Sequence, residues 1–219
     1  MITLYGVYRS RTSRPLWVLA ELELPFRHVP VIQSDRLKDT GTTDAHLNTS
    51  SPEFLAVSPM GQIPVMEEEG LILTESLAIT LYIARRYGGV LGPRSDAETA
   101  LMEQWALFAA TSIESPARRI LNTVESGAAE TVEGKSQIAL SSENLHRPLM
   151  HLQSFLGVHP YLVGDRFTVA DINVAECLRY TQEYPILVAG FPAVQEWLNR
   201  CQSRPAFRTM WRRHQAEGD

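Results

Sequence analysis

The chain has 219 residues, of which 44% are hydrophobic, enough to form the core of one large domain or of two small ones. Its net charge of −5 argues against nucleic acid as a general partner. Since no run approaches the roughly 20 apolar residues of a membrane helix and no signal-peptide pattern opens the chain, we expect a cytoplasmic protein without a membrane span.

The N-terminal part of the chain alternates a strand, a helix and a strand. Residues 2–7 alternate like a short strand, apolar residues recur at helical spacing over about 13–23, and residues 26–31 form a second strand-like run. This β-α-β order predicts parallel strands joined by a right-handed crossover. The polar stretch over 33–51 is long for a compact domain, which indicates a mobile or functional loop.

A hairpin and a helix follow this loop. The runs 63–67 and 71–73 flank a Glu-Glu-Gly turn and predict a β-hairpin, and we expect a helix over 76–86. The order of elements is typical of a thioredoxin-like fold. We therefore predict an α+β protein whose first domain spans 1–87.

The rest of the chain shows only helical patterns. Residues 87–93 are rich in glycine and form the predicted linker. A long amphipathic helix is expected over 97–122, with a kink near Pro116 because proline disrupts a helix interior. Further helices are expected over 136–156, 169–183 and 193–202. We predict an all-α second domain over 94–219.

A proline inside a strand-like run is the most specific local feature. Pro64 cannot donate a ladder hydrogen bond, and a cis bond after Ile63 would turn the Ile63 amide and carbonyl outward, where an extended peptide could pair with them. Thr74, Glu75 and Ser76 open the next helix, and a hydroxyl with free N–H groups at a helix start binds a carboxylate. These features predict a pocket for a small peptide with a terminal carboxylate.

Three segments in this order resemble signatures of the cytosolic glutathione transferases. Residues 59–65 read Pro-Met-Gly-Gln-Ile-Pro-Val, residues 75–79 read Glu-Ser-Leu-Ala-Ile, and residues 167–171 read Phe-Thr-Val-Ala-Asp. The similarity runs through most of the chain and is closest to the bacterial, serine-class-like members. It implies a thioredoxin-like domain followed by an all-helical domain, glutathione as co-substrate, and a homodimer.

The resemblance also implies how glutathione is held. Ile63, presented by a cis-Pro64, would pair with the backbone of the cysteinyl residue. Glu75 would meet the γ-glutamyl ammonium and Ser76 its carboxylate, while Gln62 would reach toward the glycyl end.

The glycyl carboxylate lacks its usual partners. Phi-like members hold it with a His-Lys pair, and the corresponding positions here are the uncharged Thr49 and Ser50. Either His46 or Lys38 supplies the cation, or glycyl binding is weaker.

Glutathione chemistry requires a thiolate, so a donor must lower a thiol pKa by roughly one to three units from its usual value of about 8.5. In the family the donor is a tyrosine, serine or cysteine near the end of the first strand, where this chain has no cysteine. This absence speaks against members that form mixed disulfides with glutathione. Ser10 is the first candidate, Thr12, Ser13 and tyrosines such as Tyr5 are alternatives, and Arg11 would add positive charge beside a thiolate.

The remaining features indicate structure more than chemistry. Thr168 and Asp171 have the spacing of a capping box, which stabilises a helix start. Cys177 and Cys201 are expected to be small core residues. Five arginines crowd the C-terminus and are interpreted as a solvated helix face: Arg200, Arg204, Arg208, Arg212 and Arg213.

The predicted function is a glutathione transferase that activates the thiol for attack on a small hydrophobic electrophile, with detoxification as its expected purpose. Peroxidase or dehalogenase activity would use the same thiolate. The helical domain would contribute the electrophile site, with candidates Trp105, Phe108, Ser112, Arg118 and Arg119, although both aromatic residues suit a core equally well. The alternative is a non-catalytic binding or regulatory protein with this fold. The spacing of the histidines gives no reason to expect a metal site.

Overall fold

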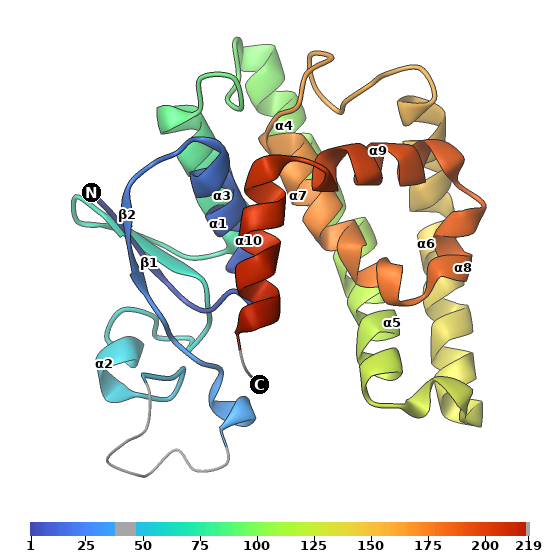
Figure 1. Ribbon diagram of the computed structural model, residues 1–219, viewed down its shortest axis with the longest axis horizontal. Coiled ribbons are helices and arrows are strands. Elements are labelled where there is room, and N and C mark those ends of the chain that lie inside the picture. The colour runs from blue at the N-terminus through green and yellow to red at the C-terminus, as the bar shows by residue number, and fades with distance from the viewer. Residues whose placement is uncertain (38–46, 218–219) are drawn as a thin grey trace. The chain divides into compact units, whose positions relative to one another are not determined.

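The computed structural model describes residues 1–37 and 47–217 and divides into two compact units (Figure 1). The first unit contains residues 1–88 and the C-terminal helix from Pro205, and the second contains residues 89–204. The predicted all-α domain over 94–219 included this last helix. Its contacts place it in the first unit, because its apolar face covers residues of the N-terminal part.

The first unit is built on a four-stranded sheet with the order β2-β1-β3-β4. β1 pairs in parallel with β2, whereas the β1–β3 and β3–β4 pairs are antiparallel. The bounds are Ile2–Tyr5 for β1, Phe26–Val29 for β2, Val65–Glu68 for β3 and Leu71–Leu73 for β4. The predicted β-α-β unit and hairpin are confirmed.

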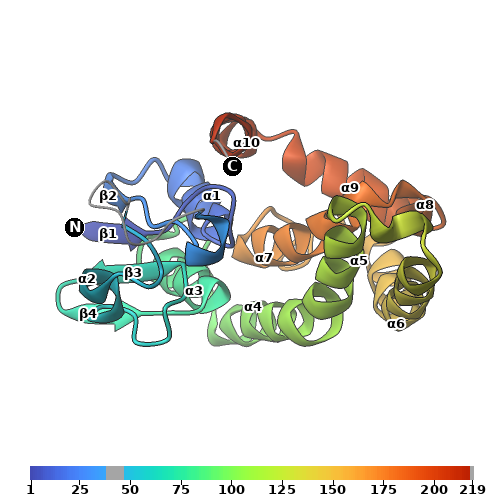
Figure 2. The same cartoon turned by 90° about the horizontal axis from the view of Figure 1, so that it is seen from below.

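Helices of the first unit pack together beside this sheet. α1 (Ser13–Glu21) lies between α3 (Ser76–Tyr87) and α10 (Pro205–Ala216), as Figure 2 shows. The short helices are η1 (Ser34–Arg36) and α2 (Pro52–Leu55). Most of α1 is buried, because apolar residues cover its length.

The described residues of the second unit form helices and loops with an isolated bridge between Val163 and Arg166. The helices are α4 (Asp96–Phe108), η2 (Ala109–Glu114), α5 (Ser115–Glu125), η3 (Ala128–Glu130), α6 (Val132–Leu156), α7 (Val169–Leu178), η4 (Arg179–Glu183), α8 (Pro185–Ala189) and α9 (Pro192–Gln202). The expected helix over 97–122 is therefore interrupted by the π-helical turn η2. This turn ends just before Pro116, which occupies the first turn of α5, where a missing N–H is tolerated.

The predicted capping box is present at the start of α7, a helix whose residues are all buried. The Thr168 amide donates to Asp171 Oδ2 at 2.8 Å, while Leu162 N and Trp197 Nε1 donate to Oδ1 at 3.1 and 2.9 Å. Complete burial nevertheless raises the pKa of Asp171 to about 6. One carboxyl thus joins a helix start, a loop and α9.

No helix within residues 1–37 and 47–217 has both the length and the apolar character required to cross a membrane.

Candidate functional site

A cavity of about 540 Å³ in the first unit is lined by all five residues expected to bind glutathione. It is formed by η1, the turn before β3 and the start of α3. Its lining residues are Arg11, Gln33, Ser34, Asp35, Thr49, Ser58, Pro59, Met60, Gly61, Gln62, Ile63, Pro64, Thr74, Glu75 and Ser76. The fold therefore brings together two motifs that a β-hairpin separates in the sequence.

The turn before β3 is held by a buried serine. Ser58 Oγ donates to the Gln62 carbonyl at 3.0 Å and accepts from the Gln62 amide at 3.3 Å. Gly61 has φ +58, and a Cβ there would lie 2.7 Å from the carbonyl oxygen of Thr49. This position therefore requires a glycine both for its backbone angle and for the close approach of another segment.

The bond between Ile63 and Pro64 is cis, as the sequence predicted. Ile63 is half-buried and lines the cavity, and its backbone N–H and C=O make no hydrogen bond within the described part of the chain. A peptide lying along this edge can therefore pair with both groups.

The start of α3 forms the opposite wall. Glu75 has φ 64, a left-handed angle that is unfavourable for a residue with a side chain, and it is exposed at the cavity. Ser76 follows as the first residue of α3 and is 4% exposed. The first N–H groups of a helix have no partners within it and carry partial positive charge, so this end favours a carboxylate.

Sequence reasoning did not identify Arg14 as a site residue. Its side chain is 1% exposed, and its Nη1 donates to Ser76 Oγ at 2.8 Å. The Ser76 hydroxyl therefore accepts from a cation and keeps its own hydrogen for a ligand. An arginine on an otherwise apolar buried helix was the available signal, because a buried charge requires partners.

Ser10 lies in a tight turn between β1 and α1. Its Oγ is 2.7 Å from the Val7 carbonyl oxygen and 2.8 Å from Thr12 Oγ1, and it accepts from the Thr12 amide at 3.0 Å. Ser10 is half-buried and does not line the cavity, whereas the next residue, Arg11, does. To donate to a thiolate, the Ser10 hydroxyl must turn its hydrogen away from the acceptors within the turn.

The alternative donors are less accessible. Thr12 and Ser13 are both 0% exposed. Tyr5 donates its hydroxyl to Glu67 Oε2 at 3.1 Å, and burial together with this carboxylate raises the pKa of Tyr5. Among the hydroxyl candidates named from the sequence, Ser10 combines partial exposure with a position next to a cavity residue.

The candidates for the glycyl cation, Lys38 and His46, lie outside the described residues. Thr49, which occupies one of the uncharged positions, lines the cavity, and its Oγ1 accepts from the Ser34 amide at 2.9 Å. The hydroxyl of Thr49 thus orders the start of η1.

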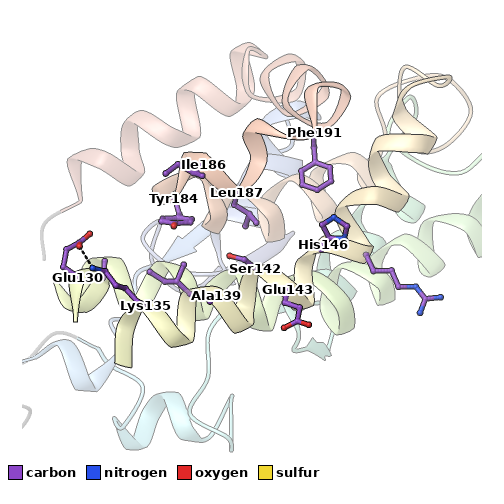
Figure 3. Close-up of a pocket in the computed structure, with 13 residues that line it drawn as sticks. Glu130, Lys135, Ala139, Ser142, Glu143, His146, Tyr184, Ile186, Leu187 and Phe191 are labelled. Atoms are coloured by element: carbon purple, nitrogen blue, oxygen red, sulfur yellow. Dashed lines mark ion pairs between the residues drawn. The ribbon is translucent and has the colours of Figure 1, made fainter. Parts of the chain in front are cut away.

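A separate cavity of about 880 Å³ lies within the second unit (Figure 3). Ala139, Ser142 and His146 on α6 face Tyr184 and Leu187 across it. None of the candidate electrophile residues lines this cavity.

The aromatic candidates for the electrophile site form part of a cluster. Trp105 is 3% exposed, stacks on His151 at a centroid distance of 5.6 Å and meets Phe108 and Phe155 edge-on at 5.4 and 5.2 Å. The role of Trp105 in the second unit is therefore packing.

Comparisons with known proteins agree with this geometry. The model of the glutathione S-transferase N-terminal domain matches residues 4–91, and that of the C-terminal domain matches residues 100–205. Glutathione S-transferase 3 of Zea mays is 32% identical over 218 residues, which covers 94% of this chain and 91% of that protein. The chain belongs to the glutathione S-transferase superfamily.

Solved glutathione S-transferases share the whole fold. Glutathione transferase F7 from Populus trichocarpa superposes with a TM-score of 0.80 at 29% identity, covering 98% of this chain and 99% of that one. A theta class glutathione S-transferase from Xanthomonas axonopodis pv. citri, solved with glutathione bound, gives a TM-score of 0.76 at 26% identity and covers 95% of both chains. Elongation factor 1-gamma 3 of Oryza sativa subsp. japonica is 32% identical over 167 residues, which cover only 39% of that protein.

Proposed function

We propose that the protein is a glutathione transferase that uses the cavity at the start of α3 for glutathione and joins the glutathione sulfur to a small hydrophobic electrophile. The observation that carries this proposal is the convergence of Gln62, Ile63, Pro64, Glu75 and Ser76 on one cavity. That cavity offers a carboxylate, a helix N-terminus and a backbone edge that no described residue pairs with, all within reach of one peptide. The backbone edge can pair with the backbone of the peptide, the carboxylate can bind its ammonium, and the helix N-terminus can bind its carboxylate.

Each charged group on the α-carbon of the γ-glutamyl residue has a partner of opposite charge or a set of hydrogen-bond donors. The Glu75 carboxylate is exposed at the cavity and would bind the ammonium. The Ser76 hydroxyl and the free N–H groups of α3 would donate to the carboxylate, with Arg14 behind Ser76 adding positive charge. The Ile63 backbone would pair with the cysteinyl residue and so hold its thiol at a fixed place.

Ser10 is the residue that we assign to the sulfur. Its hydroxyl would donate a hydrogen bond to the glutathione thiolate and favour loss of the thiol proton. The Thr12 amide, which donates to Ser10 Oγ, polarises that hydroxyl further. The thiolate then forms a carbon–sulfur bond with the electrophile. In a substitution the leaving group departs as an anion with the electrons of its bond to that carbon, and in an addition a π bond breaks and its electron pair takes up a proton.

The second unit would supply the electrophile site, two chains would form a homodimer, and the protein would act in detoxification in the cytoplasm. A peroxidase or dehalogenase side activity would require only a different acceptor for the same thiolate.

The test measures glutathione binding by calorimetry and conjugation of a generic electrophile, for the parent chain and for Ser10→Ala. We expect both to bind glutathione and the variant to lose about a hundredfold in kcat/KM, as when one hydrogen-bond donor to a developing anion is removed. Ser203→Ala is the matched control, because Ser203 Oγ also donates to a carbonyl three residues earlier, that of Arg200, at 2.8 Å.

The other outcomes separate the alternatives. Equal turnover in parent and Ser10→Ala would move the donor role to Thr12, Ser13 or a tyrosine. Binding without turnover across several electrophiles would favour a non-catalytic glutathione-binding protein. Absence of glutathione binding would overturn the assignment of Ile63, Pro64, Glu75 and Ser76.

A further inference from the structure

The turn that carries Ser10 is held from outside by the C-terminal helix and by Glu217, the residue that follows it. Arg213 Nη1 donates to the Tyr8 hydroxyl at 2.9 Å, and its guanidinium carbon lies 5.9 Å from the centroid of the Tyr8 ring. The Arg9 amide donates to Glu217 Oε2 at 2.7 Å. Both contacts reach residues that immediately precede Ser10.

α10 packs firmly against α1. Phe207 packs edge-on against Trp17 of α1 with a centroid distance of 4.7 Å, and Trp17 is 0% exposed. Met210, one turn further along α10, is 2% exposed. The helix is therefore anchored on the outside of α1, and Arg213 in its last turn and Glu217 directly after it reach the Ser10 turn.

The other side of the same turn is held by β2. The His28 ring meets the Tyr8 ring edge-on at a centroid distance of 5.4 Å, and His28 Nε2 is 2.8 Å from the Gly6 carbonyl oxygen. Tyr8 is thus fixed between β2 and α10. Movement of the Ser10 turn requires that at least one of these contacts breaks.

We propose that Arg213 and Glu217 are positioning residues, which fix the turn before Ser10 so that its hydroxyl meets the glutathione sulfur. This inference rests on the proposed function, since it assigns to α10 a part in the same reaction. In this proposal neither Arg213 nor Glu217 contacts the substrate. Misplacement of a reacting group by about 1 Å can cost about a hundredfold in rate, so two hydrogen bonds at this place matter to catalysis.

The experiment compares Arg213→Gln and Glu217→Ala with the parent chain and with Arg212→Gln. Arg212, the neighbour of Arg213 in the sequence, is a matched control. Its guanidinium bonds only within α10 among the contacts of the described residues, to the Arg208 carbonyl at 3.4 Å and to Thr209 Oγ1 at 3.3 Å. We expect kcat to fall about tenfold in the two positioning variants with little change in glutathione affinity, and Arg212→Gln to match the parent.

Two further measurements distinguish positioning from general loss of structure. The apparent pKa of the bound glutathione thiol, taken from the pH profile of kcat/KM for the electrophile at saturating glutathione, should rise in both positioning variants. Adding Ser10→Ala to Arg213→Gln should cause no loss beyond that of Ser10→Ala alone, since both changes remove the same interaction. Unchanged kcat and thiol pKa in properly folded Arg213→Gln and Glu217→Ala would overturn the inference.

Amide hydrogen exchange tests the same inference independently of turnover. The Arg9 and Thr12 amides should exchange faster in Glu217→Ala than in the parent or in Arg212→Gln, because the Ser10 turn loses its support. If the parent conjugates no electrophile, the proposed function fails while the exchange result still decides whether α10 holds this turn. Unchanged exchange would contradict the positioning role.

Discussion

The guanidinium of Arg14 donates to Ser76 Oγ across 2.8 Å in the interior of the first unit, and so joins the first turn of α1 to the first turn of α3. The cavity is lined by Arg11, which lies two residues before α1, and by Ser76, the first residue of α3. Arg14 thereby orients Ser76, the residue proposed to bind the γ-glutamyl carboxylate, without itself lining the cavity.

Replacing Arg14 should weaken glutathione binding. Arg14→Met keeps most of the side-chain length but removes the charge and the hydrogen bond to Ser76, which is worth about 1.5–3 kcal/mol for a charged donor. We expect the Kd for glutathione to rise about tenfold, as measured by calorimetry. Ser76→Ala combined with Arg14→Met should add little, and independent, additive losses would contradict this coupling.

Gly61 offers a test of the turn that presents Ile63. Gly61→Ala places a Cβ 2.7 Å from the Thr49 carbonyl oxygen at φ +58, so both collision and backbone strain oppose it. Gly70→Ala is the matched control, because Gly70 has φ +84 but nothing within 4 Å of the added atom. Urea denaturation should show a loss of about 1–2 kcal/mol from strain in both variants and a larger loss in Gly61→Ala.

The same pair of variants separates stability from binding. Glutathione affinity should fall in Gly61→Ala and stay at the parent value in Gly70→Ala, which lies in the β3–β4 turn. Equal affinity in all three chains would show that the approach of Thr49 does not shape the cavity.

The buried Asp171 carboxyl predicts a stability that depends on pH. Its folded-state pKa of about 6 lies above the usual 3.8, so the folded protein holds this proton more tightly than the unfolded chain. The contribution is therefore fully present below about pH 4 and is lost as the pH rises through about 6, by about 3 kcal/mol in total. Asp171→Asn removes this titration.

The measurement is the free energy of unfolding of the parent minus that of Asp171→Asn between pH 4 and pH 7. This difference should fall as the pH rises, and it should become flat above the folded pKa. A difference that is constant, or that rises with pH, would contradict the raised pKa of Asp171. Groups that titrate equally in both chains contribute equally to the two free energies, so their contributions cancel in this difference.

The Glu98–Arg166 pair predicts the opposite dependence. Arg166 Nη1 and Nη2 donate to the two Glu98 oxygens at 2.9 and 2.6 Å, and this guanidinium lowers the pKa of Glu98 to about 2. The pair therefore stabilises the folded state above about pH 4.5, and this contribution is lost as the pH falls toward 2.

Arg166→Gln should cost about 1–2 kcal/mol at neutral pH, in line with a half-buried bidentate pair. The cost measured by chemical denaturation should shrink as the pH falls from 5 toward 3. Arg147→Gln, an exposed arginine on α6, should be neutral at every pH. A cost of Arg166→Gln that does not depend on pH would assign its effect to the bonds with the Gly92 and Val90 carbonyls instead.

Local patterns in the sequence predicted much of this fold. The alternation of residues 2–7, the turn after β3 and the Thr168–Asp171 spacing each depend on neighbours in the chain, and each is confirmed within a few residues. The cavity residues were also identified from short motifs. Their convergence required only the hairpin between them.

What the sequence did not reveal depends on contacts between distant segments. Arg14 looked like any arginine on a helix until α3 was placed beside it. Arg213 belonged to a cluster interpreted as a solvated face, yet it bonds to Tyr8, and Arg204 lies 4.0 Å from the centroid of the Phe167 ring. Helical spacing shows which residues share a face, but it does not show which element covers that face.

The first unit combines the beginning and the end of the chain, and this arrangement sets an order for its biosynthesis. While the ribosome is still making the second unit, Trp17 has no Phe207 to cover it, and the Ser10 turn has no Arg213 or Glu217 to hold it. The N-terminal segment therefore reaches its final packing only after α10 has left the ribosome. A tag inserted directly after α10 would disturb this packing, since Arg213 in the last turn of that helix and Glu217 just after it hold the Ser10 turn.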